Sequence, residues 1–298
     1  MVGELTYFLG LQVKQTDKGI YINQAKYARN IVKRFALKNA AYARTPMATN
    51  TKLGIDPSSQ PVDITLYRSM IGCLLYLTAS HFDISFSVDV CARFQANPKM
   101  THLIVVKKII KYVSGTCDFV LFYSKESNVS LVGYSDADWA SNADDRKSTT
   151  GGCYYVGTNL VAWMSKKTKK KICLSINCRS KIYWCWMLLF TTSLDEKLLS
   201  DYGLTQDTMV IYCDNSGAID ISKNLVQHSR TKHIEIRYHF IRDLVERKIV
   251  DLEYIPTDHQ NDDIFPNLLI GASLSHFVKW FMLSHVHSLS LDTYGPCA

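Results

Sequence analysis

The sequence predicts an α/β protein, with helices dominating its first part and strands alternating with helices in its second part. Three observations lead to this prediction. Runs rich in β-branched and aromatic residues are bounded by turn residues, and apolar residues elsewhere recur at helical spacing. Acidic residues stand where several strand-like runs end. The 298 residues are enough for two domains of ordinary size.

The first part begins with a predicted hairpin over residues 5–24, with its turn at residues 17–19. A helix is predicted over residues 24–37, because apolar residues recur at every fourth position from Tyr27, with Lys and Arg on the other faces. A polar loop rich in Pro, Ser, Thr and Asn follows over residues 44–63.

Helical patterning resumes over residues 65–95 and again over residues 100–116. Gly115 stands at the end of the second stretch, and its position is typical of a C-cap glycine. The first part is therefore expected to be mostly helical, with one β-hairpin.

The second part starts near Asn128, and its order of predicted strands and helices is typical of a layered α/β unit. Its predicted elements are a strand over residues 129–140, a hairpin over 151–167 turning at 157–159, a strand running into a helix over 208–224, a helix over 233–249 and a strand over 250–257. In the last strand Val250, Leu252 and Tyr254 alternate with acids, as expected of a half-buried strand with these three residues facing inward.

Composition narrows the class of protein. Apolar residues make up 47% of the chain and charged residues 20%, so a folded core is expected. The net charge of +7 fits a polyanion partner, although such a charge is also common in proteins that have none. The sequence has no charged leader before an apolar segment and no run of about 18 apolar residues, so no secretory signal and no membrane partner are predicted.

The nine cysteines show no CxxC pair and no Cys/His spacing of a zinc site. We therefore expect reduced, mostly buried thiols in a reducing compartment. Together with the absent signal, this predicts an intracellular protein, either cytoplasmic or nuclear.

Three acids are candidate metal ligands. Asp136 and Asp214 follow strand-like runs, and Asp263 lies at a predicted helix start. Carboxylates from separate elements suit a hard divalent cation such as Mg²⁺. Spacing alone leaves the alternative that they are solvated caps.

A resemblance to a known family bears on that choice. The stretches "GYSDADWASNADDRKSTTGGCYYVGTNLVAWMSKK", "CDNSGAIDISKN", "RTKHIEIRYHFIRD" and "DDIF" closely resemble the ribonuclease H domain of Copia-type LTR retrotransposon Pol polyproteins. Upstream, "FLGLQV", "GIYINQAKYARNIVKRF", "TPMATN", "LYRSMIGCLLYLTASHFDISFSV" and "KYVSGT" resemble the end of the same family's reverse transcriptase. These motifs keep the family's order from Gly3 to about Phe265.

The resemblance implies two domains. Residues 1–125 would be a C-terminal fragment of reverse transcriptase with the palm end, thumb and connection. Residues 126–298 would be a ribonuclease H-like domain, with a mixed five-stranded sheet and flanking helices. The family activities are RNA-directed DNA synthesis and two-metal hydrolysis of RNA in RNA–DNA hybrids.

The implied site uses Asp, Glu, Asp and Asp to hold two Mg²⁺ ions. Asp136 matches the first position, with Asp138 as a nearby alternative. Asp214 matches the third position. Asp263 matches the fourth, and Asp262 is the alternative if the helix is rotated slightly.

The second position departs from the family. The family reads roughly "LSxAEAEY" where this chain reads "LSINCRSKIY", and alignment places Ser180, Lys181 or Ile182 at the ligand Glu. Residues 146–194 contain no Asp or Glu, so no realignment supplies one. Two divalent cations close together repel each other, and bridging carboxylates offset that repulsion. We therefore expect hydrolysis to be crippled or absent, and the occupancy of the metal site to be reduced.

Other departures concern the reverse transcriptase. The family's catalytic YxDD hairpin would precede "FLGLQV", so DNA synthesis by these residues is not expected. Phe82 stands where the family usually has Pro before Asp83, and Pro266 follows Asp263 early in a helix.

The lysine run after the second hairpin would face a nucleic-acid backbone in such a domain, although lysine runs are often only solvated turns. Its members are Lys166, Lys167, Lys169, Lys170 and Lys171. The expected partners are RNA–DNA hybrid or other nucleic acid and the remainder of a Pol polyprotein. Nucleic-acid binding without efficient cleavage is the leading hypothesis, with a functionless remnant of a decayed element and an active hybrid ribonuclease as alternatives.

Overall fold

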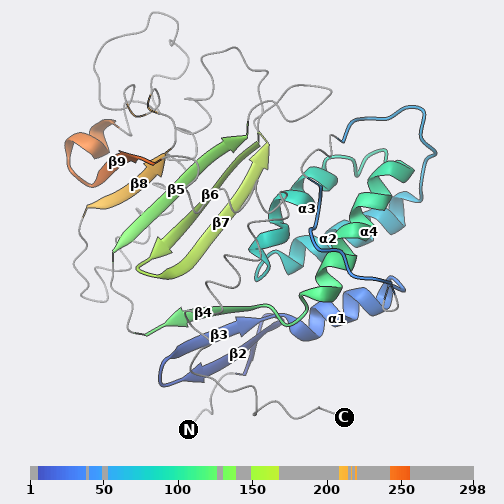
Figure 1. The fold of residues 1–298 in the computed structure, drawn as a ribbon, viewed down its shortest axis with the longest axis horizontal. Helices are drawn as coiled ribbons and strands as arrows, with labels where there is room; N and C mark the ends of the chain where they lie inside the picture. The colour runs from blue at the N-terminus through green and yellow to red at the C-terminus, as the bar shows by residue number, and fades with distance from the viewer. Residues whose placement is uncertain are drawn as a thin grey trace, which may run out of the picture.

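A computed structural model describes residues 6–37, 40–48, 53–125, 130–138, 149–167, 208–213, 216, 219 and 242–255. For residues 135–138, 149–150 and 166–167 it describes the backbone position. Within these ranges the chain forms two sheets and a group of helices, which lie beside one another (Figure 1).

The first part combines a four-stranded antiparallel sheet with helices. The sheet has the order β1-β2-β3-β4, with β1 at Tyr7–Phe8, β2 at Leu11–Thr16, β3 at Gly19–Asn23 and β4 at Val120–Ser124. The described helices of this part are α1 (Ala25–Arg34), α2 (Ile64–Leu77), α3 (Ser85–Ala92) and α4 (Met100–Gly115), with a 3-10 turn η1 (Phe82–Ile84) leading into α3. The predicted hairpin and helices are present, and β1 and β4 extend the hairpin into a sheet.

Gly19 is needed where β4 joins this sheet. The register pairs Thr16 with Gly19, so the turn consists of the two residues between them, within the predicted turn. Gly19 has a φ of 153° and pairs with Ser124, and a Cβ at Gly19 would lie 2.1 Å from the carbonyl oxygen of Tyr123. Any larger residue would therefore push β4 away.

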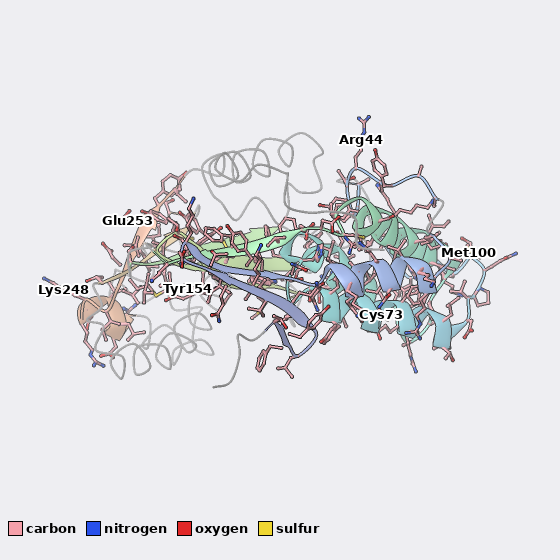
Figure 2. All side chains as sticks on the ribbon, turned by 90° about the horizontal axis from the view of Figure 1, so that it is seen from below. Arg44, Cys73, Met100, Tyr154, Lys248 and Glu253 are labelled. Atoms are coloured by element: carbon pink, nitrogen blue, oxygen red, sulfur yellow. The ribbon has the colours of Figure 1, made fainter. Side chains whose placement is uncertain are left out.

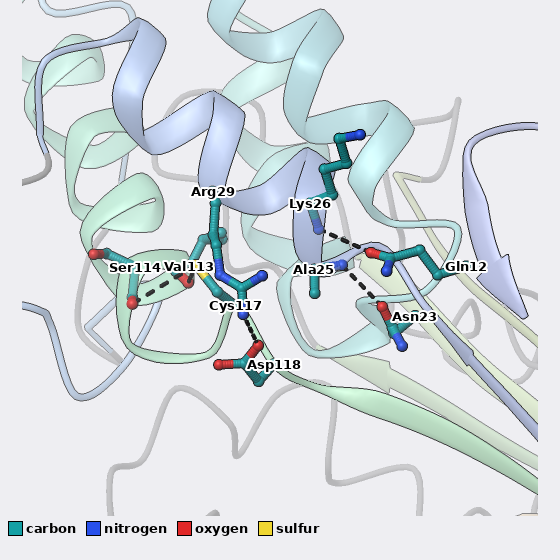
Figure 3. A network of polar contacts seen from close by, with 9 residues as sticks. All are labelled: Gln12, Asn23, Ala25, Lys26, Arg29, Val113, Ser114, Cys117 and Asp118. Carbon is teal, nitrogen blue, oxygen red and sulfur yellow. Dashed lines mark hydrogen bonds and ion pairs between the residues drawn. The ribbon is translucent and has the colours of Figure 1, made fainter. Parts of the chain in front are cut away.

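Helix α1 begins directly after β3, and side chains of the hairpin satisfy its first N–H groups (Figure 3). The Ala25 N–H donates to Asn23 Oδ1 at 3.1 Å, and the Lys26 N–H donates to Gln12 Oε1 at 3.0 Å. The first N–H groups of a helix have no partner within it, so these two bonds fix where α1 starts.

Helix α4 ends at Gly115 as predicted, but not through a left-handed glycine. The C-cap is Thr116, with φ −125° and ψ 21°. Gly115 instead allows a close approach, because a Cβ there would meet the Tyr42 side chain at 3.3 Å. The prediction of a glycine C-cap was therefore wrong, and packing explains the residue.

The helices of the first part enclose one apolar core. Tyr67 lies within it and is fully buried, and its hydroxyl donates to the carbonyl oxygen of Cys91 at 2.8 Å. The fully buried aliphatic residues of this core include Ile71, Leu74, Leu77, Ile84, Val88, Val106, Ile109, Ile110 and Val113.

The second sheet has the order β7-β6-β5-β8-β9. Its strands are β5 (Leu131–Asp138), β6 (Thr149–Val156), β7 (Asn159–Lys167), β8 (Met209–Cys213) and β9 (Val250–Tyr254). Strand β6 is antiparallel to β5 and β7, whereas β5, β8 and β9 run parallel. Residues 242–246 are helical and precede β9. This arrangement confirms the predicted fold class, an α/β protein with a mixed five-stranded sheet.

Strand β9 corrects one predicted orientation. Val250 and Leu252 are buried as expected, but Tyr254 is 58% exposed. Tyr254 is the last residue of a strand that has one neighbour, β8, within the described sheet, and it pairs with Cys213, the last residue of β8. A residue at such a corner has little neighbouring structure to cover it.

The two parts lie along the long axis of the molecule. Figure 2 shows Met100 and Arg44 at one end and Lys248 and Glu253 at the other. Among the described residues no helix is both long and apolar enough to cross a membrane. The five described cysteines are free thiols, at positions 73, 91, 117, 153 and 213.

Candidate functional site

The candidate site begins at the carboxyl ends of two central strands. Strands β5 and β8 are parallel neighbours, and their last paired residues are Ser135 and Cys213. Asp136 is the next residue of β5, and Asp214 follows Cys213 in the sequence. Parallel strands end at the same edge of a sheet, which is where α/β proteins commonly build their sites. Asp214 itself lies outside the described residues.

Glycines face this end of β5 from the neighbouring strand. Asp136 pairs with Gly151 of β6, and Ser135 pairs with Gly152. Neither glycine carries a side chain, so β6 places no side chain beside Ser135 and Asp136 at these positions. Glycine inside a strand often marks a place where a ligand or another backbone approaches closely.

Tyrosines from three strands pack together on the sheet, and two of them, Tyr134 and Tyr212, lie just before this edge. The rings of Tyr134 and Tyr212 are stacked with centroids 5.2 Å apart, and Tyr155 meets Tyr134 edge-on at 5.8 Å. Burial raises the pKa of Tyr212, and the Glu253 carboxylate raises it further. Asp136 comes two residues after Tyr134 and so occupies the next position on the same face of β5.

The other predicted ligands are not brought together within the described residues. Asp138 ends β5 and pairs with Thr149. Asp262 and Asp263 lie outside the described residues, and so do Ser180, Lys181 and Ile182. The described part of the chain contains no group of three His, Cys, Asp or Glu residues that would hold a metal. The convergence of three carboxylates therefore stays a prediction.

Part of the lysine run lies at the same end of the sheet. Lys166 pairs with Thr150, which in turn pairs with Ala137 next to Asp136. Lys167 follows as the last residue of β7. The backbone thus brings two of the five lysines across the sheet from Asp136, whereas Lys169, Lys170 and Lys171 lie outside the described residues.

The strongest basic excess lies elsewhere, and the sequence analysis did not locate it. Residues 1–125 carry sixteen Lys and Arg against seven Asp and Glu, a net charge of +9. Residues 126–298 carry eighteen against twenty, a net charge of −2. Counting charge separately for the two parts would have shown this from the sequence alone.

Two helices contribute much of this charge. Helix α1 contains no acid and exposes Lys26, Arg29, Lys33 and Arg34. Helix α4 also contains no acid and exposes Lys107, with Lys108 and Lys111 half-buried. The two helices contact each other, so both belong to the helical group of the first part. Its Arg29 pairs with Asp118 (Figure 3).

Comparison with known proteins identifies the family. The chain is 35% identical over 284 residues to the retrovirus-related Pol polyprotein from transposon RE1 of Arabidopsis thaliana, covering 93% of this chain and 19% of that protein. It is 31% identical over 283 residues to the corresponding polyprotein from transposon TNT 1-94 of Nicotiana tabacum, covering 90% and 21%. The chain belongs to the Copia-type Pol polyprotein family.

The family resemblance predicted from the motifs is thereby confirmed. The chain spans about a fifth of the length of these curated relatives. A shorter relative, the uncharacterized mitochondrial protein AtMg00810 of Arabidopsis thaliana, is 31% identical over 166 residues, with 56% of this chain and 69% of that protein covered. No protein-family model matches the chain.

Two solved ribonuclease H1 structures align with about half of this chain. LC11-RNase H1, isolated from compost by a metagenomic approach, aligns with 12% identity and a TM-score of 0.36 over 48% of this chain and 98% of that chain. RNase H1 from Halobacterium salinarum aligns with 12% identity and a TM-score of 0.30 over 48% and 99%.

Proposed function

We propose that this chain is a nucleic-acid-binding part of a Pol polyprotein that holds RNA–DNA hybrid and hydrolyses its RNA strand weakly or not at all. In this proposal residues 1–125 are the C-terminal fragment of reverse transcriptase, and residues 126–298 are the ribonuclease H-like domain. The observation that carries it is the register of β5 with β8, which brings Asp136 to the edge where β8 also ends.

The donor set near that edge fits Mg²⁺. Asp136 stands beside Gly151, and Asp214 follows the strand that pairs with β5. Carboxylate oxygens from neighbouring strand ends are the ligands that Mg²⁺ prefers. Asp136, Asp214 and Asp263 are the residues that would hold the metal. A bound Mg²⁺ would activate water and stabilise the leaving oxygen.

The reduced activity follows from the donor set. Residues 146–194 supply no carboxylate, so the position of the family's Glu is left to Ser180, Lys181 or Ile182. A neutral residue there removes one ligand, and a lysine adds positive charge beside the metals. Either change weakens joint occupancy by two cations, because their mutual repulsion is no longer offset.

Nucleic-acid binding is supported by the charge of the first part. A net charge of +9 over residues 1–125, with exposed basic residues on α1 and α4, favours a polyanion. Lys166 and Lys167 add positive charge at the Asp136 end of the sheet. Phosphate contacts of this kind make binding salt-dependent and independent of base sequence.

The test measures binding and cleavage of one labelled hybrid in the same sample. We expect the unmodified chain to bind, with an affinity that falls as salt rises, and to leave the RNA strand uncut in Mg²⁺. Ser180→Glu, Lys181→Glu and Ile182→Glu, made separately, are expected to include one variant that gains cleavage. Adding Asp136→Asn to that variant should abolish the gain and keep binding.

Two outcomes would overturn the proposal. Robust cleavage by the unmodified chain that Asp136→Asn abolishes would make it an active hybrid ribonuclease. A folded chain that binds no hybrid at low salt would have no role in holding nucleic acid, as expected of a functionless remnant.

A further inference from the structure

A second apolar cluster joins the two sheets. Its buried members are Phe82 from η1, Leu121 from β4 and Cys153 from β6. Partly buried side chains from both sheets pack against it, including Ile22, Phe119, Tyr123, Tyr134, Tyr155, Leu160 and Trp163. This cluster has other members than the core of the helices. Because its members come from both parts of the chain, the two parts share it.

Phe82 lies at the centre of this contact. Its ring meets Phe119 edge-on at 5.6 Å and Trp163 at 6.2 Å. We call Phe82, Phe119 and Trp163 the aromatic junction. Aromatic pairs in this arrangement contribute beyond the area they bury, because the positive edge of one ring faces the negative face of the other.

Trp163 adds a directional bond. Its indole Nε1–H donates to the carbonyl oxygen of Thr78 at 2.9 Å. Thr78 is the C-cap of α2, and the last carbonyls of a helix have no partner within the helix. A strand of the five-stranded sheet therefore satisfies the end of a helix in the other part of the chain.

Asn159 makes the second polar connection. Its Oδ1 accepts from the Ser124 N–H at 2.7 Å, and its Nδ2 donates to the Ser124 carbonyl at 3.2 Å. Ser124 ends β4, which is an edge strand of the first sheet. The side-chain amide thus pairs with a backbone unit of that edge in the way a further strand would.

We propose that the aromatic junction and the Asn159–Ser124 pair lock the five-stranded sheet to the helices, so that the chain unfolds as one unit and presents its basic helices and the Asp136 end of β5 as one binding body. The locking of the two parts rests on the contacts described above. The presentation of one binding body rests on the proposed nucleic-acid binding.

The lock is tested by hydrogen exchange of the folded full chain, followed separately in α4 and in β8. In the unmodified chain we expect the slowest amides of both elements to open with the same free energy, as one cooperative unit. Combining Trp163→Phe with Asn159→Ala should make β8 exchange at least about tenfold faster while α4 changes little, because the two parts then open separately.

Matched controls come from contacts inside the first part. Tyr21→Leu disturbs an aromatic pair with Phe122 whose centroids are 4.6 Å apart, and Asn23→Ala removes a cap of α1. With the junction intact, each control should speed exchange in α4 and β8 together. Different opening free energies in the unmodified chain, or equal acceleration of both elements by the junction variants, would overturn the lock.

The presentation of one binding body is tested with hybrids of two lengths. A long hybrid that reaches both parts should lose about tenfold in affinity in the Trp163→Phe, Asn159→Ala variant, because the second contact no longer has a high effective concentration. A short hybrid that reaches one part should keep its affinity within about twofold. Equal losses of affinity for both lengths would overturn the presentation of one binding body. If the unmodified chain binds neither hybrid, the proposed function fails, and the exchange result still decides the lock.

Discussion

The helical part and the five-stranded sheet place their polar groups in opposite ways. The helical part buries several of them inside its core, where Asp83 accepts from the Tyr112 hydroxyl and His102 bonds the carbonyl of Gly54. The sheet brings the charged residues Asp136, Lys166 and Lys167 to its end. One region therefore holds the fold together, and the other carries the predicted chemistry. Substitutions in the helical core should therefore act mainly on stability, and substitutions at the sheet end mainly on binding and cleavage.

The largest effect is expected in the helical core. Ile109→Ala should lower the free energy of unfolding by about 2–5 kcal/mol, because Ile109 is fully buried and truncation leaves a cavity. Ile104→Ala is the matched control on the same helix, since Ile104 is 61% exposed and its change should stay within about 0.5 kcal/mol. Urea unfolding measures both. Equal effects would contradict the position of the core.

Next in size is the buried bond to Asp83. Tyr112→Phe removes the hydroxyl that donates to Asp83 Oδ2 at 2.7 Å, and Asp83 is 5% exposed. We expect a loss of about 1–3 kcal/mol, because a buried carboxylate loses a donor. Tyr76→Phe is the control, because its hydroxyl bonds a carbonyl at the surface, and thermal unfolding compares the two. A larger loss in Tyr76→Phe would contradict the assignment.

Alkaline pH should weaken the helical part through Tyr27. Burial, followed by the hydrogen bond with Cys73, raises the pKa of Tyr27 from 10.0 to about 12. The folded chain then holds this proton more tightly than the unfolded chain. Its contribution is complete below pH 10 and is lost as the pH rises towards 12. Tyr27→Phe should flatten the fall in stability over that window, as measured by urea unfolding at several pH values. An unchanged slope would contradict the shift.

The smallest effect is expected at the surface pair of Arg29 and Asp118 (Figure 3). Both side chains are more than half exposed, at 59% and 77%. Arg29→Ala should therefore change stability by at most about 1 kcal/mol. The same variant should reduce the salt dependence of hybrid binding if α1 contacts phosphates, so titrations at several salt concentrations separate its two roles. A loss of stability as large as that of Ile109→Ala would contradict its surface position.

Local patterns account for the parts of the fold that the sequence could predict. The β2–β3 hairpin, helix α4 and the β6–β7 hairpin all follow from periodicity and turn residues close together in the chain. Pairing between β3 and β4 was missed because it joins residues 19–23 to residues 120–124, and no local pattern records such a contact. The orientation of Tyr254 failed because alternation says nothing of where a sheet ends.

The candidate site and its surroundings also combine features that the sequence predicts with features that it does not. Asp136 was predicted near the end of a strand and lies two residues before the last residue of β5, because a strand and the acids near its end are neighbours in sequence. The bond from Trp163 to Thr78 had no sequence signal, since an aromatic in a strand looks the same in any core. The sequence reading treated Phe82 as a departure from the family. The structure gives it a packed place between Phe119 and Trp163.

Strand β4 lies far along the sequence from its partner β3, and this separation affects how the chain folds. The hairpin of β2 and β3 is complete once residue 23 has been made, but its partner on the other side follows only after α4. Closing so long a loop is slow compared with forming the helices. During synthesis the outer edge of β3 is therefore an unpaired strand edge, and it is the segment of this sheet most open to pairing with another chain.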